Sequence, residues 1–233
     1  MIEGLKSLTF DRARPPSVTD QVYEELYVRI MKLVLPPGAK LSEAEVAGQM
    51  GVSRQPVRDA FYRLSQVKLL MIRPQRATVV TPISIEAVYE AIFVRTALEM
   101  ETVRAAIPNL DAARLGALED LLERQRKAVA ADDRETFHMY DDRFHFTICE
   151  AAGHAHVWTL IQNHKAHMDR IRYLSLENGA GFALEEHLRI FDRLAARDEA
   201  GALDEMRQHL QRIGTKLEGV RAAHAECFDL EAS

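Results

Sequence analysis

The stretch LSEAEVAGQMGVSRQPVRDAFYRL, residues 41–64, predicts two short helices joined by a tight turn. Ser42 and Glu45 have the spacing of a capping box, which marks the start of the first helix. Gly51 suits the positive-φ residue at which such a helix ends. A second helix follows at once, and its first turn decides how the whole stretch is interpreted.

The second helix is predicted to bury one face and to present polar side chains on the other. Ser53 is a suitable N-cap, and Pro56 falls in the first turn, where a missing N–H costs little. The apolar residues recur at i, i+4 and i+7: Val57, Phe61 and Leu64. Three polar residues begin the opposite face: Arg54, Gln55 and Arg58. This is the layout of a DNA-reading helix-turn-helix, although a generic helical hairpin with solvated charges has the same pattern.

The flanking segments favour DNA binding. From Arg54 to Arg76 the chain has six basic residues and one acidic residue. Residues 69–82, LLMIRPQRATVVTP, have a β-branched end and a central Pro-Gln-Arg turn, which predict a two-stranded wing. Residues 18–35 have apolar side chains at helical spacing and stop at Pro-Pro-Gly. The sequence therefore predicts a winged helix-turn-helix.

Charge separates this basic segment from the rest of the chain. Residues 1–81 carry 12 Lys/Arg and 8 Asp/Glu, whereas residues 82–233 carry 18 and 27. A basic head on an acidic body indicates that only the head meets a polyanion. No signal peptide and no long uncharged apolar run is visible, and two cysteines without a pairing motif, Cys149 and Cys227, suit a reducing compartment. We therefore expect a cytoplasmic protein with no membrane partner.

A domain boundary is predicted at Thr81-Pro82-Ile83, which assigns residues 1–81 to the DNA-binding domain and residues 82–233 to a second domain. In the second domain the apolar spacing predicts six helices, the fourth of them kinked or split: 84–107, 111–130, 133–151, 155–177, 182–197 and 199–224. No strand pattern competes. The expected fold class is mainly α, with an N-terminal winged helix-turn-helix and a C-terminal all-α bundle.

One carboxylate and three imidazoles in the second domain form a candidate metal site. Asp141 and His145 are four residues apart and leave the same face of one predicted helix. His187 and His209 lie inside two later helices. These ligand types suit Zn, Ni, Mn or Fe, and the sequence does not choose among them.

Each of these residues also has an ordinary explanation. A single histidine within a helix is usually a satisfied surface or core residue, and an Asp-x₃-His pair is common by chance. Two neighbours compete as ligands, because His138 lies one turn before Asp141 and Asp142 lies three residues before His145. The metal interpretation therefore needs support from outside these four residues.

The chain resembles the GntR family of bacterial transcriptional regulators, in its FadR branch, from about residue 18 to residue 217. LPPGAKLSEAEVA and GVSRQPVRDAFYRL match the family's winged-helix pattern in a long segment without gaps. VRTALE, residues 94–99, and DDRFH, residues 141–145, resemble two elements of the branch's FCD-type ligand-sensing domain. His187 and His209 fall where that domain supplies its other metal ligands.

The resemblance implies a homodimer that binds a pseudo-palindromic operator in double-stranded DNA and acts as a repressor. The residues implied in DNA contact are Ser53, Arg54, Gln55, Pro56, Arg58, Gln75 and Arg76. The implied metal ligands are Asp141, His145, His187 and His209. A small carboxylate effector, an organic or sugar acid, is expected at the open metal position, with Arg95, Asn163 and Arg172 as the candidate effector-binding residues. Arg95 has the alternative role of an i,i+4 ion pair with Glu99.

Three positions depart from the family pattern. Val67-Lys68 replaces the usual Glu-Gly after the second helix, and Ala77 stands where the wing tip usually has glycine. Ala44 replaces an arginine that binds phosphate in many members. Without these contacts, Arg54, Gln55, Arg58 and Arg76 must carry more of the DNA binding.

Two other classes of protein compete with the regulator. One is a metalloenzyme with an appended DNA-binding head, but four-helix di-metal enzymes need paired Glu-x-x-His motifs, and this chain has only Glu135 to His138. The other is a structural DNA-binding protein without a ligand, which leaves the Asp/His constellation unexplained. We therefore predict a ligand-responsive regulator that is not an enzyme.

Overall fold

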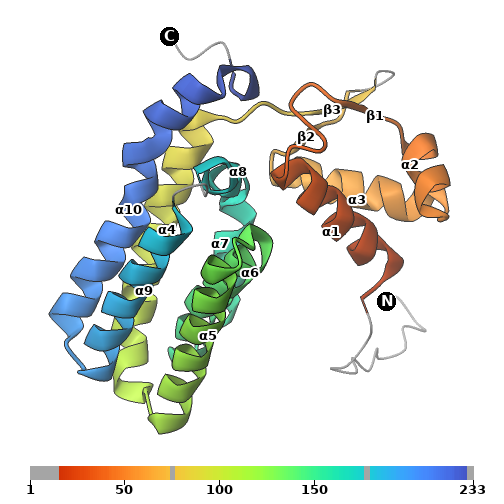
Figure 1. Ribbon diagram of the computed structural model, residues 1–233. Helices are drawn as coiled ribbons and strands as arrows, with labels where there is room; N and C mark the ends of the chain where they lie inside the picture. Colours follow the sequence, from red (N-terminus) through yellow and green to blue (C-terminus); the bar gives the residue numbers. More distant parts are fainter. Residues whose placement is uncertain (1–15, 74–76, 176–178, 230–233) are drawn as a thin grey trace, which may run out of the picture.

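The computed structural model describes residues 16–73, 77–175 and 179–229. Figure 1 shows a small head of helices and a sheet beside a body of long helices. The head contains α1 (Val18–Met31), β1 (Lys40–Leu41), α2 (Glu43–Met50), α3 (Arg54–Gln66), β2 (Leu70–Met71) and β3 (Thr78–Val80). This is a winged helix-turn-helix, as the sequence predicts.

The wing is part of a three-stranded sheet with the order β1-β3-β2 and antiparallel pairing throughout. Lys40 pairs with Val79, and Leu70 pairs with Val80. The strand β1 was not predicted, because two residues are too short to show an alternating pattern. It ties the segment before α2 to the wing, so the sheet and the reading helices form one unit.

The caps of the two reading helices differ from the prediction. Ser42 and Ser53 do occupy the N-cap positions of α2 and α3, but neither side chain makes a capping hydrogen bond. Gly51 has the expected left-handed conformation, with φ +66°. The core face of α3 is as predicted, since Val57, Phe61 and Leu64 are buried. Core packing therefore holds α3 more than its cap does.

The body consists of helices, as predicted. The long ones are α4 (Ile85–Ala106), α5 (Ala112–Ala130), α6 (Arg134–Ala151), α7 (His156–His164), α8 (Ala166–Ser175), α9 (Ala180–Ala195) and α10 (Glu199–Ala223), with short 3-10 turns η1 (Ile107–Asn109) and η3 (Ala225–Cys227). The predicted fourth helix is split into α7 and α8 at Lys165. The Lys165 side chain is buried there against the carboxylates of Asp142 and Asp169.

The hydrophobic cores of head and body are almost separate. The head core draws on residues from Val22 to Val80, with Ala166 of α8 as its one buried member from the body. The other buried clusters contain residues from Ile83 onward. Cys149 and Cys227 are free and buried. None of the described helices is long and apolar enough to cross a membrane.

Candidate metal centre and DNA-reading helix

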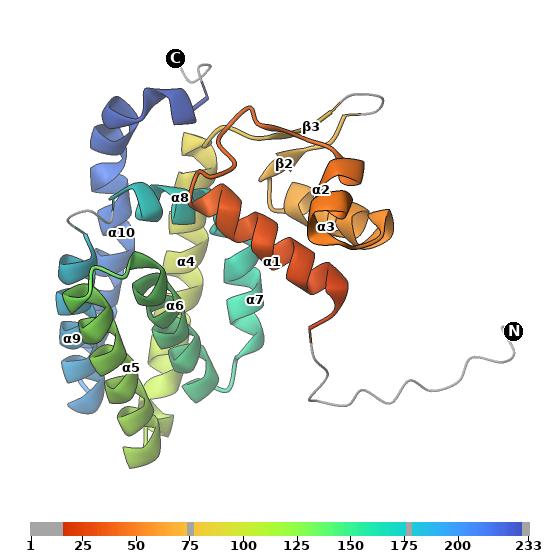
Figure 2. The ribbon, with the colours of Figure 1, turned by 45° about the vertical axis from the view of Figure 1, so that its right-hand side comes forward.

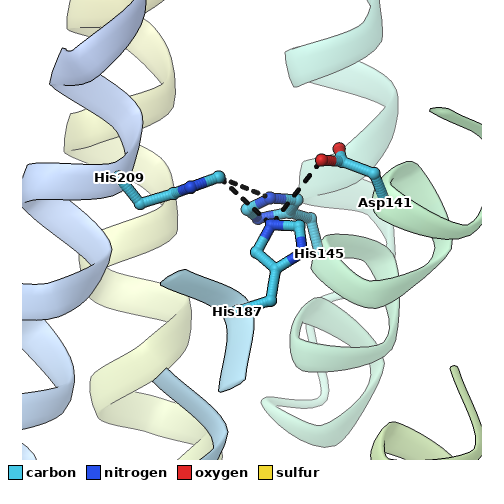
Figure 3. A group of neighbouring side chains, drawn as sticks. All are labelled: Asp141, His145, His187 and His209. Atoms are coloured by element: carbon cyan, nitrogen blue, oxygen red, sulfur yellow. Dashed lines mark hydrogen bonds and ion pairs between the residues drawn. The ribbon is translucent and has the colours of Figure 1, made fainter. Parts of the chain in front are cut away.

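Four buried side chains from three helices of the body converge on one point. Asp141 and His145 come from α6, His187 from α9 and His209 from α10 (Figure 3). Each offers one ligand atom, and these atoms all lie within 4.8 Å of one another. The residues that the sequence singled out as metal ligands are therefore brought together by the fold.

Each of the three histidines is oriented by an oxygen atom from a second residue. Nδ1 of His187 lies 2.8 Å from Oε1 of Gln125, Nδ1 of His209 lies 2.8 Å from Oε2 of Glu186, and Nδ1 of His145 lies 2.5 Å from Oε2 of Glu99. The oxygens of Gln125 and Glu186 accept hydrogen bonds from the rings, and the carboxylate of Glu99 attracts a proton on Nδ1 of His145, so each oxygen favours the neutral tautomer with the proton on Nδ1. The other nitrogen, Nε2, is then left with a lone pair.

The three Nε2 atoms face one another. Nε2 of His209 lies 3.3 Å from that of His187 and 3.2 Å from that of His145. Burial holds the pKa of His187 and of His209 well below the ordinary value, which keeps both rings neutral. Three lone pairs at this separation repel one another unless a cation lies between them. The donor set therefore fits a divalent metal.

Asp141 completes the donor set and carries its negative charge. Burial raises its pKa, but the opposing attraction of Arg172 and the three imidazoles is greater, so its pKa lies well below the ordinary value. Oδ1 lies 3.6 Å from Nε2 of His187, and Oδ2 forms an ion pair with Arg172. Apart from this ion pair, neither oxygen has a hydrogen-bond partner among the described residues, so Oδ1 remains able to ligate a cation.

A second group of potential metal ligands shares Asp141 with the first. His138, Asp141 and Asp142 also lie close enough to share an ion. In this group, however, Oδ2 of Asp142 is already paired with the ammonium of Lys165 at 2.8 Å, and the group offers one imidazole instead of three. The group with three histidines is therefore the better metal centre.

A cavity opens beside the four ligands. Its empty volume is about 510 Å³, including space open to solvent, and Asp141 and His209 form part of its wall. Four cationic side chains also line it: Arg95, Arg172, Arg212 and Lys216. Asn163 does not line this cavity, because it lies exposed near the end of α7 and borders two other surface hollows. The structure thus brings two of the three predicted effector residues to the site.

Arg95 forms the ion pair with Glu99 that the sequence offered as its alternative role, and it also lines the cavity. Its Nε donates to Oε1 of Glu99 at 2.6 Å, within a pair whose side chains are 4% and 2% exposed. Its Nη2 is buried without a hydrogen-bond partner, in a residue that lines the cavity. Glu99 therefore orients both Arg95 and His145, a role that sequence reasoning missed along with those of Gln125 and Glu186.

The predicted DNA-contacting residues lie on and before the first turns of α3. Ser53, Arg54, Gln55 and Arg58 are exposed, and Pro56 is half-buried. Gln55 donates to Asp59 at 2.8 Å, and Arg58 forms an exposed ion pair with Glu43 at 2.9 Å. Such exposed contacts are weak and can be exchanged for contacts to DNA. Gln75 and Arg76 lie outside the described residues.

Comparison with known proteins agrees with this architecture. Residues 18–80 match the family of bacterial regulatory proteins called gntR, and residues 90–212 match the FCD domain. The HTH-type transcriptional repressor RspR of Escherichia coli K12 is 36% identical over 216 residues, which cover 92% of this chain and 95% of the repressor. The gluconate operon transcriptional repressor of Bacillus subtilis is 26% identical over 208 residues, covering 85% of this chain and 84% of that protein.

A solved structure shows the same arrangement of head and body. The structure of McbR/YncC from E. coli matches with a TM-score of 0.75 at 26% identity, and the match covers 87% of this chain and 98% of that one. A winged-helix head on a helical body defines a transcriptional regulator, a class whose members are not enzymes. The chain belongs to the GntR family and carries an FCD domain.

Proposed function

We propose that this GntR-family protein is a metal-dependent repressor of the FadR branch that responds to a small organic or sugar acid. The observation that carries the sensing part is the set of three histidine Nε2 atoms beside the buried carboxylate of Asp141, with Nε2 of His209 3.3 Å from that of His187 and 3.2 Å from that of His145. A structural role for these residues would not require all three lone pairs to face one another.

Operator DNA is the partner of the head, which we assign to residues 1–81. In our proposal the exposed start of α3 enters the major groove, where Arg54 and Arg58 bind guanine edges or phosphates and Gln55 binds an adenine edge. The α3 N-terminus with Ser53 holds a phosphate, beside Pro56. Gln75 and Arg76 contact DNA from the wing. A homodimer places two such helices on a pseudo-palindromic site in the bacterial cytoplasm.

The effector binds in the body, residues 82–233, in this proposal. Asp141, His145, His187 and His209 hold the metal, which supplies an open coordination position for a carboxylate or hydroxyl oxygen. Arg95 and Arg172 line the adjacent cavity and bind the acid's remaining charge. The donor set accommodates Zn, Ni, Mn or Fe. The name of one relative, the gluconate operon transcriptional repressor, supports a sugar acid as effector and repression as the direction of control.

Metal and effector binding can be tested in the full-length protein with one set of variants. We expect about one tightly bound divalent ion per chain, by titration after chelation, in a dimer of twice the 26.4 kDa chain mass. Gluconate and other small carboxylic acids should then weaken binding to a duplex selected from a random library. Asp141→Ala and His187→Ala should abolish metal binding and this response.

Two exposed residues provide matched controls. Asp192 and His164 are exposed and lie outside the donor set, so Asp192→Ala and His164→Ala should bind metal and respond as wild type does. An effector response that survives unchanged in Asp141→Ala would show that the acid binds elsewhere. A metalloenzyme with an appended head is the weaker alternative, because the relatives are named as transcriptional regulators.

A further inference from the structure

Helix α8 touches both the candidate sensing site and the DNA-binding head. Figure 2 shows it beside the end of α1, at the junction of head and body. Met168 and Arg172 line the cavity next to the histidines. Ala166, at the other end of the helix, is buried in the hydrophobic core of the head. Ten residues therefore span the distance between the two functional parts.

Two more side chains of α8 hold the backbone around the head–body boundary. The N–H of Ser84 donates to Nδ1 of His167 at 3.1 Å, and Nε2 of His167 lies 3.1 Å from the carbonyl oxygen of Lys68. Arg170 is fully buried and donates from Nη1 to the carbonyl oxygen of Thr81 at 2.8 Å. A shift of α8 would therefore move the head relative to the body.

Asp169 is the point at which α8 meets α1. Its Oδ2 accepts a hydrogen bond of 2.8 Å from the hydroxyl of Tyr27 on α1 and lies 2.5 Å from Nζ of Lys165. Its Oδ1 lies 3.5 Å from Nη1 of Arg172. Asp169 is 1% exposed, so solvent does not screen these contacts. Helix α1 packs directly on α3, and Tyr27 is thus one helix away from the DNA-reading surface.

Arg172 joins Asp169 to the metal centre. Its Nη2 pairs with Oδ2 of Asp141, and its Nη1 lies 3.5 Å from Asp142 as well as from Asp169. A carboxylate that ligates a divalent cation attracts a guanidinium less, because the two positive charges compete for the same oxygens and repel each other. Ligation by Asp141 therefore shifts Arg172 towards its two remaining carboxylates.

We propose that α8 couples metal occupancy to DNA binding, and that the hydrogen bond between Asp169 and Tyr27 carries the coupling. This inference rests on the proposed metal site and on operator binding. When Asp141 ligates the cation, the guanidinium of Arg172 moves towards Asp169. This movement alters the hydrogen bond from Tyr27 to Asp169, and α1 then shifts against α3. The effect on affinity must be reciprocal, since linkage requires DNA to alter metal affinity by the same factor.

The test compares two tyrosines on one helix. Tyr27→Phe removes the hydroxyl that donates a hydrogen bond to Asp169. Tyr23→Phe removes the hydroxyl of a neighbouring ring, whose centroid lies 5.9 Å from that of Tyr27, and this hydroxyl has no hydrogen bond among the described residues. The dissociation constant of a duplex selected from a random library is measured for full-length protein with and without Zn²⁺ alone. Metal affinity without DNA is measured by competition with a chromogenic chelator.

We expect Zn²⁺ to change DNA affinity by about 5–150-fold in wild type and in Tyr23→Phe. In Tyr27→Phe the DNA dissociation constants with and without Zn²⁺ should differ by no more than about twofold, while metal affinity without DNA stays close to that of wild type. Hydrogen exchange of residues 18–31 should respond to Zn²⁺ in wild type and Tyr23→Phe but not in Tyr27→Phe.

The possible failures are distinguishable. If Tyr27→Phe keeps the wild-type ratio, the relay is wrong and the proposed function stands. If wild type binds Zn²⁺ tightly but its DNA affinity is unchanged, the coupling is absent and the relay is wrong, while the metal site stands. If wild type binds no metal, both the metal-dependent function and the relay are overturned.

Discussion

Gln125 shows, at the scale of one residue, how a neutral side chain orients a proposed metal ligand. Its Oε1 accepts from Nδ1 of His187 at 2.8 Å, and its Nε2 donates to the carbonyl oxygen of Tyr140 at 3.2 Å, so the orientation of the amide is fixed. We predict that Gln125→Leu weakens metal affinity by about 10–100-fold, because His187 is then no longer held in one tautomer. Titration with Zn²⁺ measures this. Gln208→Leu, an exposed change on α10, is the control, and equal affinities would contradict the prediction.

The same scale shows why only part of the site could be predicted. The spacing of Asp141 and His145 places both on one helix face. His187 and His209 were candidates because they lie inside two later helices, and the family resemblance supported them. Gln125 and Glu186 escaped prediction, because only the packing of α5, α9 and α10 brings their oxygens to the imidazoles. Asn163 is displaced from the cavity by the break between α7 and α8, which the apolar period did not locate.

At the scale of the element, α3 carries the exposed polar residues that we propose contact DNA. Arg54 is exposed in its first turn, and the structure gives it no ion pair, unlike Arg58. We predict that Arg54→Ala costs about 1–3 kcal/mol of binding free energy and relaxes one operator position. Anisotropy titrations on the selected duplex and its single-base variants measure both effects. Arg207→Ala, an exposed change on α10, should have no effect, and an equal loss on every duplex would show that Arg54 binds only phosphate.

The presence of each helix was easier to predict than the residues at which it begins and ends. The long helices of the body follow the apolar spacing closely, since each buries a continuous stripe of side chains. The first helix ends at Met31 rather than at residue 35, because Leu33 adopts a left-handed conformation with φ +56° and packs on a cluster in the body. A contact with a distant part of the chain therefore overrides the local helical pattern.

At the scale of the whole molecule, His167 makes the junction of head and body sensitive to acid. Nδ1 of His167 accepts a hydrogen bond from the backbone N–H of Ser84. Protonation of Nδ1 would place two N–H donors opposite each other, and this hydrogen bond would be lost. Burial, with a smaller contribution from Arg170, lowers the pKa of His167 to about 4. The unfolded chain takes up the proton near pH 6.5, so the stabilising contribution is complete above that pH and is lost as the pH falls towards 4.

We predict that His167 alone accounts for about 2 kcal/mol of the unfolding free energy lost between pH 7 and pH 5. His167→Gln should lose less stability over this interval than wild type does, as measured by urea unfolding of the metal-free protein. His164→Gln changes an exposed histidine and should follow wild type. A pH dependence for His167→Gln as steep as that of wild type would show that His167 takes up its proton in the folded protein as readily as in the unfolded chain.

The contacts between α8 and the head–body junction bear on whether DNA-binding heads can be exchanged between regulators. His167 and Arg170 bind the backbone of Lys68, Thr81 and Ser84, and every residue other than proline offers such backbone groups. A foreign head could keep these bonds whatever its side chains. Other contacts do depend on the identity of the head: the tyrosine that meets Asp169, the hollow that receives Ala166, the packing of Leu33 on the body, and the exposed ion pairs of Lys32 with Glu135 and of Lys68 with Glu90. A chimaera that preserves the two contacts with Asp169 and Ala166 should pass its sensor's signal to a new operator.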